Sequence, residues 1–215
     1  MKIQYLFLTL FSLNIARLNN TLPTDNVNND KWETVKSSQG VQTFVRWIET
    51  VNGIKTRERK GEMYIDCSPE DAIAILKDTK SSSGWMNNVK ESFELDRINQ
   101  HEWYTYTLFN MPWPFEKRDL VSFQKMIRDA ENKNTIINII SREDYIPYKS
   151  RITRLTEYIA KWSIVSINQC RIKITFTAVT SSPPIFPRWI QDPIVENMFH
   201  NNLVNLKAYI LLNKK

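Results

Sequence analysis

Residues 187–212, PRWIQDPIVENMFHNNLVNLKAYILL, form the last long segment of the chain, and their pattern is that of one amphipathic helix. Apolar side chains recur at helical spacing and make a single stripe, which consists of Ile190, Ile194, Val195, Met198, Phe199, Leu203, Leu206, Tyr209 and Ile210. Pro193 marks either a second helix start after Asp192 or a kink in a helix that begins at Pro187. In both cases one long C-terminal helix is predicted.

Segments that favour β-structure fill most of the chain before this helix. Short turns rich in Asn, Asp, Lys and Pro join them, which is typical of an antiparallel meander. Residues 32–36 are expected to form a short helical turn. The expected strands are 41–49, 55–65, 92–98, 102–109, 118–128, 134–141, 151–159, 161–167 and 171–180.

A helix start interrupts the strands at Ser68-Pro69-Glu70-Asp71. Ser68 can cap the helix, proline suits its first turn, and the acidic residues complement its dipole. Residues 81–84, SSSG, then break the chain before Trp85-Met86. The predicted fold is α+β, with two small helices and a curved antiparallel sheet of about seven to nine strands wrapped around the long C-terminal helix. One helix fills so large a curve incompletely, so we expect a cavity.

Composition restricts the classes of function. The chain has only 4 Gly and lacks both G-x-x-x-x-G-K-[ST] and G-x-G-x-x-G, which argues against a nucleotide-binding fold. The net charge is +6 and the pI about 9.2, but Lys and Arg are scattered rather than gathered in blocks. This pattern indicates a solvated basic surface with a weak attraction to anionic membranes. A nucleic-acid site is not expected, because the aromatic residues fall on apolar faces.

The first 20 residues differ from the rest of the chain. Lys2 precedes a short apolar run, which reads as a secretory signal peptide, and residues 21–30 read as a polar linker. We expect residues 31–213 to form the folded domain and the protein to be exported to the periplasm or the cell exterior. An uncleaved anchor or a simple amphipathic start is the alternative, and the protein would then be cytoplasmic.

Neither cysteines nor histidines indicate a metal or catalytic centre. Cys67 and Cys170 are expected to be buried free thiols, or to pair if the protein is exported. His101 and His200 are expected at the surface, without the neighbours that a nucleophile–base pair or a zinc site needs. No cofactor and no metal are predicted.

Residues 112–119, PWPFEKRD, resemble a motif of the StAR-related lipid transfer (START) family, in which an aromatic residue lies between two prolines and an Arg-Asp pair opens the next strand. Three other parts stand in the same order: Trp85-Met86, Trp162 before Ile164, and residues 187–190, PRWI. The resemblance covers roughly residues 30–212. It implies the helix-grip fold and an internal cavity that binds a lipid or sterol.

Two departures from the family pattern concern the site. Family members often have glycines before the last helix, where this chain has residues 181–184, SSPP. Some sterol-binding members carry a ligand-facing arginine where this chain has Gln124. Recognition of the ligand by a buried charged pair at that position is therefore not expected.

The resemblance implies that the cavity is gated by the C-terminal helix and by a loop of residues 111–117. Pro112 and Pro114 stiffen this loop, and Trp113 either closes the cavity, enters a membrane interface or packs against the last helix. Arg118 and Asp119 either tie the loop structurally or hold a lipid head group.

Alternation along residues 118–126 puts Leu120, Ser122, Gln124 and Met126 on one face. If that face points inward, Ser122 and Gln124 bind ligand, water or each other; a local hydrogen bond is the alternative. Which of Trp103 and Tyr104 faces inward stays open. The other candidate wall residues, which could equally be plain core, are Trp85, Met86, Phe109, Trp162, Phe176, Trp189, Met198 and Phe199.

These features predict a monomeric, non-catalytic carrier of one hydrophobic ligand, by the resemblance a lipid or sterol, that contacts a membrane surface transiently and binds no nucleic acid. The alternative is a helix-grip cyclase or hydrolase that acts on a polyketide-like or aromatic substrate. Such an enzyme would need a convergent acid–base set in the cavity, and the sequence shows none.

Overall fold

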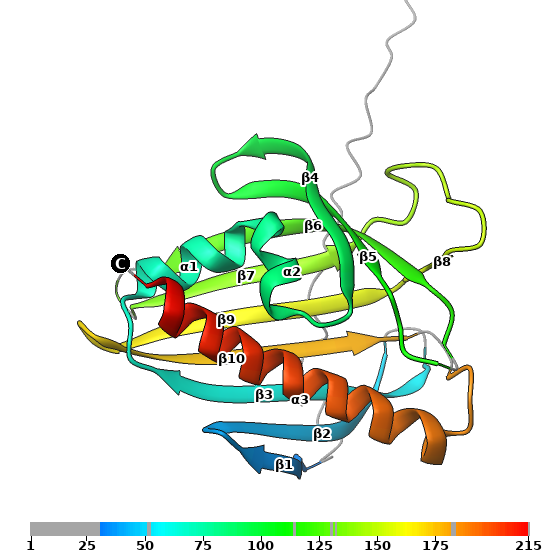
Figure 1. Cartoon of the computed structure of the whole chain (residues 1–215), viewed down its shortest axis with the longest axis horizontal. Helices are drawn as coiled ribbons and strands as arrows, with labels where there is room; N and C mark the ends of the chain where they lie inside the picture. The colour runs from blue at the N-terminus through cyan, green and yellow to red at the C-terminus, as the bar shows by residue number, and fades with distance from the viewer. Residues whose placement is uncertain are drawn as a thin grey trace, which may run out of the picture.

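An antiparallel sheet forms the body of the molecule (Figure 1). The computed structural model describes residues 31–50, 53–113, 115–129, 131, 133–181 and 184–214. The predicted leader and linker, and Pro114 in the predicted gate, lie outside these residues. The described strands are β1 (Glu33–Ser38), β2 (Val41–Glu49), β3 (Lys55–Ile65), β4 (Val89–Asn99), β5 (Glu102–Phe109), β6 (Arg118–Asp129), β7 (Asn134–Ser141), β8 (Thr153–Arg154), β9 (Tyr158–Asn168) and β10 (Arg171–Thr180).

The strand order is β1-β2-β3-β10-β9-β7-β6-β5-β4, with the short β8 parallel to the start of β6. β3 and β10 are far apart in the sequence but pair in the middle of the sheet. The chain therefore builds two meanders that join along one seam. This arrangement confirms the predicted antiparallel sheet.

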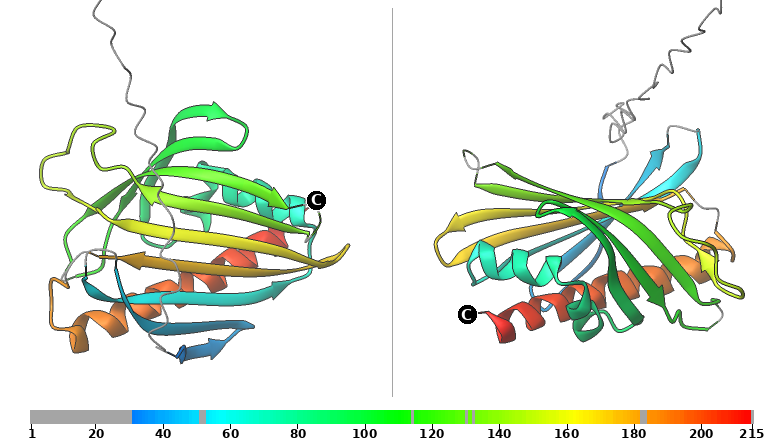
Figure 2. Two further views of the ribbon diagram at one scale, coloured as in Figure 1. Left: turned by 180° about the vertical axis from the view of Figure 1, so that it is seen from behind. Right: turned by 90° about the horizontal axis from the view of Figure 1, so that it is seen from above.

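The described helices all lie on one face of the sheet (Figure 2). They are α1 (Pro69–Lys77), the 3₁₀ turn η1 (Thr79–Ser81), α2 (Ser82–Trp85) and α3 (Arg188–Asn213). Ser68 caps α1 as predicted, since its Oγ accepts a hydrogen bond from the Asp71 N–H at 3.1 Å. α3 begins at Arg188 and runs through Pro193, so this proline does not start a second helix. None of the described helices is long and apolar enough to span a membrane.

Two sequence predictions of secondary structure are wrong. Residues 32–36 do not form a helical turn; β1 pairs with β2 across a tight turn in which Gln39 and Gly40 have φ of 52° and 71°. The predicted break between strands 151–159 and 161–167 is also wrong: β9 runs unbroken from Tyr158 to Asn168 between β7 and β10 and contains all of 161–167, whereas only Thr153–Arg154 (β8) is a strand among residues 151–157. β9 pairs with a neighbouring strand on each side, and Ala160 lies opposite Ile139 of β7 and Ala178 of β10, so the strand continues through residue 160.

The position of α3 leaves part of the concave face uncovered. A Cβ atom at Gly61 on β3 would overlap the Leu203 side chain of α3, so the helix lies directly on that strand. The main core therefore lies under α3 and α1, where Met63, Ile174 and Leu206 are buried. Figure 1 shows α3 crossing β10 and β3, whereas β4, β5 and β6 lie to one side of the helix.

Candidate ligand-binding cavity

A cavity of about 270 Å³ is lined by residues of the sheet, of α2 and of α3. Its volume is at the low end of the range of about 300–1,000 Å³ that is usual for ligand pockets. The lining residues come from most elements of the fold: Leu76, Thr79, Ser82, Trp85, Met86, Asn88, Ser92, Thr105, Thr107, Phe109, Met111, Arg118, Leu120, Ser122, Gln124, Ile139, Leu155, Tyr158, Trp162, Phe176, Phe199, Asn202 and Leu203.

One wall of the cavity is a continuous row of aromatic rings. Trp85 meets Trp162 edge-on, with ring centroids 6.3 Å apart. Trp162 stacks on Phe176 at 3.9 Å, and Phe176 stacks on Phe199 of α3 at 5.6 Å. These contacts join α2, β9, β10 and α3 into a single apolar surface. Such a surface suits a hydrocarbon chain or a ring system.

The opposite wall carries hydroxyl and amide groups from β4, β5 and β6. Ser92 and Thr107 share a hydrogen bond of 3.1 Å, and Thr105 and Ser122 share one of 2.9 Å. Gln124 Nε2 donates to Thr105 Oγ1 at 3.1 Å. The wall thus satisfies much of its own hydrogen-bonding capacity, and a ligand need not supply polar partners along it.

Arg118 lines the end of the cavity where β6 begins. Its guanidinium carbon lies 5.9 Å from the centroid of the Phe115 ring. Its Nε atom is buried and has no hydrogen-bond partner among the described residues. Burial lowers the pKa of Arg118, against a smaller opposing effect of Glu116. The side chain nevertheless keeps its charge, because an arginine titrates far above neutral pH.

Asp119 points to the other face of β6 and pairs with Arg154 instead of Arg118. Arg154 Nε and Nη2 donate to its two carboxylate oxygens at 3.0 and 2.8 Å. Both side chains are only 1% exposed. Arg154 also donates to the carbonyl oxygens of Glu143, Ile146 and Pro147, which holds the 142–152 loop against the sheet. Asp119 therefore ties a loop, whereas its neighbour in the predicted pair faces the cavity.

Eight of the predicted ligand-contact residues line this cavity: Trp85, Met86, Phe109, Ser122, Gln124, Trp162, Phe176 and Phe199. The structure does not bring the other three to it. Trp113 is 90% exposed and Trp189 is 78% exposed, while Met198 is half-buried on α3 outside the lining. Pro112 is exposed in the same loop as Trp113.

Sequence reasoning missed several lining residues that carry polar groups, among them Thr105, Thr107 and Tyr158. Thr105 could have been found from its register, because it lies directly opposite Ser122 on the neighbouring strand. Trp103, whose direction was open, is the buried member of its pair, and Tyr104 stacks on Tyr145 at 3.9 Å.

The expectation that His200 is a surface residue is wrong. This side chain is 1% exposed and packs from α3 against β1 and β2. His200 Nε2 shares a hydrogen bond of 2.8 Å with Ser38 Oγ, and Nδ1 lies 3.5 Å from Thr43 Oγ1. Burial, and to a smaller extent Lys36, lowers the pKa of the imidazole. The ring thus helps to hold α3 and lies away from the cavity.

Both cysteines are free thiols, and only one of them is buried. Cys67 is buried, and burial raises its pKa to about 11, while Cys170 is exposed at the β9–β10 turn. The prediction that both are buried is therefore wrong for Cys170. Within the described part of the chain, no group of three or more His, Cys, Asp and Glu side chains could hold a metal ion.

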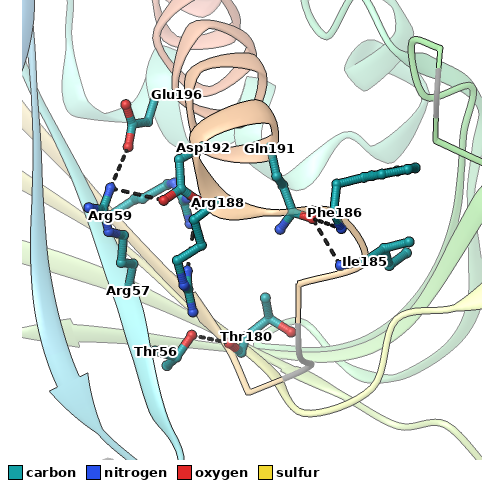
Figure 3. A network of polar contacts seen from close by, with 10 residues as sticks. All are labelled: Thr56, Arg57, Arg59, Thr180, Ile185, Phe186, Arg188, Gln191, Asp192 and Glu196. Carbon is teal, nitrogen blue, oxygen red and sulfur yellow. Dashed lines mark hydrogen bonds and ion pairs between the residues drawn. The ribbon is translucent and has the colours of Figure 1, made fainter.

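A second polar network fixes the N-terminal end of α3 (Figure 3). Buried Asp192 lies 3.1 Å from Arg57 Nη1, 3.6 Å from Arg59 Nη2 and 3.7 Å from Arg188 Nη1. Arg57 also contacts Glu196 at 3.1 Å. Gln191 Oε1 accepts from the backbone N–H groups of residues 185 and 186, which ties the preceding loop to the helix.

The geometry defines the class of fold. A long C-terminal helix held against a curved antiparallel sheet, with a cavity between them, is the helix-grip arrangement of START-related lipid transfer proteins. The structure of such a protein from Xanthomonas axonopodis superposes with a TM-score of 0.73 at 24% identity, covering 84% of this chain and 99% of that one. Human STARD10 gives a TM-score of 0.69 at 19% identity, covering 84% and 73%. The resemblance inferred from residues 112–119 is confirmed at the level of the fold.

The sequence relatives are 22–24% identical to this chain over the matched residues. No family model matches the chain. An uncharacterized protein of Pseudomonas aeruginosa is 24% identical over 180 residues, which are 83% of this chain and 86% of that protein. Mouse START domain-containing protein 10 is 22% identical over 162 residues, and the match spans about half of that relative, 54% of its length. An aromatase/cyclase from Streptomyces shares the fold more loosely, with a TM-score of 0.51 at 10% identity, covering 72% and 93%.

Proposed function

We propose that this protein, as a monomer, binds one lipid in its cavity and carries it between membranes. The observation that carries the proposal is the cavity itself. One of its walls is a continuous row of aromatic rings, and another is formed by polar side chains that hydrogen-bond to one another. A hydrocarbon chain or ring placed there would be removed from water along most of its surface.

A cyclase or hydrolase on the same fold is the second candidate, since the Streptomyces aromatase/cyclase shares the arrangement. Such chemistry needs a proton donor and acceptor that face the substrate. Among the described lining residues there is no histidine, aspartate or glutamate. Burial raises the pKa of the lining residue Tyr158, so this phenol stays protonated at neutral pH. The lining therefore favours binding over turnover.

We further propose that the ligand enters between the 110–117 loop and the start of α3. The two segments touch through Phe115 and Phe186, whose ring centroids are 5.3 Å apart. Trp113, Ile185 and Trp189 project from this region, and they are among the most exposed large apolar side chains described. Exposed tryptophans at such a site suit the interface of a membrane.

The apolar run in residues 1–20 supports a proposal that the protein is exported. Cell fractionation, together with determination of the N-terminal residue of the mature protein, tests it. Recovery of the intact chain from the cytoplasm would reject export without affecting the proposal of lipid binding.

Filling the cavity tests the proposed function directly. Thr107 lines the cavity on β5, so Thr107→Trp should occupy the space that the ligand needs. Thr175→Trp is the matched control, because strand alternation puts it on the opposite face of the sheet from Phe176. Native mass spectrometry should detect a lipid at unit stoichiometry on the wild type and the control, but not on the filled variant. The proposal would be contradicted if the wild-type protein is purified without a bound lipid and then takes up no fatty acid, phospholipid or sterol.

A further inference from the structure

Arg118 is the single charged side chain among the described residues that line the cavity. A cation that is partly removed from water is unfavourable unless an anion or a set of acceptors compensates it. The buried Nε of Arg118 lacks a hydrogen-bond partner among the described residues. This half-buried cation therefore has one N–H donor for which the described residues provide no acceptor.

The neighbouring acidic groups do not remove this charge. Asp119 faces away from the cavity and both of its oxygens accept from Arg154. Glu116 is exposed, and its influence on Arg118 is smaller than that of burial. Arginine presents a fork of N–H donors that matches carboxylate and phosphate oxygens. An anion in the cavity would supply the missing acceptor.

A second donor lies at the same end of the cavity. The backbone carbonyl of Asn88 accepts a hydrogen bond from the N–H of Asn110. Asn110 directly follows β5, whose last residue, Phe109, pairs with Arg118 at the start of β6. Among the described residues, the Nδ2 group of Asn88 donates only to the Met111 sulfur, at 3.8 Å, and a thioether is a weak acceptor. Arg118 and Asn88 both line the cavity near the 110–117 loop.

We propose that the ligand is an amphiphile with one anionic head group, a carboxylate or a phosphate monoester, which Arg118 binds and Asn88 assists. Its apolar part extends away from the 110–117 loop along the aromatic wall. The volume of about 270 Å³ suits a single chain. This inference rests on the proposed function and specifies its class of ligand. It gives Arg118 the recognition role that Gln124 cannot fill.

Pairs of probes that differ only in head-group charge test the inference. We would measure by calorimetry the affinities for palmitate and hexadecanol, and for palmitoyl lysophosphatidic acid and monopalmitoylglycerol, below their micelle concentrations. The wild type should bind at least one anionic probe about 10- to 100-fold more tightly than its neutral partner. Arg118→Gln should abolish this preference and leave the affinity for the neutral probe unchanged. Whichever pair shows the preference distinguishes carboxylate from phosphate.

Two variants serve as controls. Lys117→Gln removes one charge from the exposed neighbour and should keep the preference, and Arg118→Lys should keep part of it. In addition, ¹³C NMR of carboxyl-labelled palmitate should show a lower carboxyl pKa when it is bound to the wild type than when bound to Arg118→Gln. Circular dichroism and a denaturation curve establish that each variant is folded.

The outcomes separate this inference from the proposed function. Equal affinity of the wild type for both members of each pair, unchanged in Arg118→Gln, would overturn the anionic head group and leave a carrier of neutral lipids. Absence of binding for all four probes and for the broader lipid panel would overturn the carrier itself.

Discussion

At the scale of single residues, two adjacent side chains on one strand face opposite sides of the sheet and make different contacts. Arg118 and Asp119 read as one charged pair in the sequence, but strand alternation sends them to different faces of β6. Asp119 joins Arg154, which lies 35 positions away in the chain. No local pattern predicts such a partner, because the parallel pairing of β8 with β6 brings the two residues together.

We expect Arg154→Met to destabilise the protein strongly. The substitution leaves the Asp119 carboxylate buried without its cation and frees three backbone carbonyls of the 142–152 loop. Removal of one member of a buried pair costs about 3–5 kcal/mol in the free energy of unfolding. Urea denaturation measures the loss. The exposed pair of Arg97 and Glu94 provides the control, and Arg97→Met should cost less than about 1 kcal/mol. Equal losses in the two variants would refute the structural role of Arg154.

His200 should make stability depend on pH. Its folded-state pKa is lowered below the ordinary value of 6.5, so the unfolded chain takes up a proton before the folded protein does. Its contribution to stability is then complete above about pH 6.5 and is lost as the pH falls below that value. Thermal unfolding between pH 7.5 and 5 should show this decline, and His200→Gln should reduce it. A matching reduction in His101→Gln would show that the decline has another origin.

At the scale of elements, prediction succeeded where the signal is local. The bounds 102–109 and 134–141 agree with β5 and β7, because alternation is visible in each strand alone. The wall residue Phe199 and the exposed Trp189 belong to the same helix, yet only the first lines the cavity. A helical stripe does not reveal which of its turns faces a cavity, since that depends on where α3 lies along the sheet.

The start of α3 depends on one carboxylate. Asp192→Asn leaves Arg57, Arg59 and Arg188 without their common anion, and Arg59 is the most deeply buried of the three. Since these arginines retain some contact with solvent, we expect a loss of about 2–3 kcal/mol in the free energy of unfolding. Hydrogen exchange should accelerate in the first turns of α3 and less near residue 210. As a control, Glu62→Gln removes a carboxylate from the half-buried contacts with Lys60 and Lys173 and should leave exchange in α3 unchanged. Unchanged exchange in Asp192→Asn would mean that apolar packing alone holds this end of the helix.

At the scale of the whole molecule, the apolar side chains near the proposed entrance distinguish transfer from storage. Trp113 and Trp189 are exposed but lie outside the cavity lining, so they can act on the rate of exchange without contacting the bound ligand. Changing both to Ser should remove two interfacial anchors and slow lipid transfer between vesicles by about tenfold or more. Equilibrium affinity for a soluble lipid probe should be unchanged.

The opposite end of the sheet offers the matched control for this experiment. Tyr64 and Ile167 are also exposed, and they lie toward the ends of β3 and β9 that are remote from Thr180 and the loop before α3. Tyr64→Ser with Ile167→Ser removes apolar surface away from the proposed entrance, so transfer between fluorescently labelled donor and acceptor vesicles should continue at the wild-type rate. Equal slowing in both double variants would indicate a general loss of surface hydrophobicity. Full transfer by the tryptophan variant would place the membrane contact elsewhere, because the loss of two interfacial anchors should slow exchange even when the cavity and its affinity stay intact.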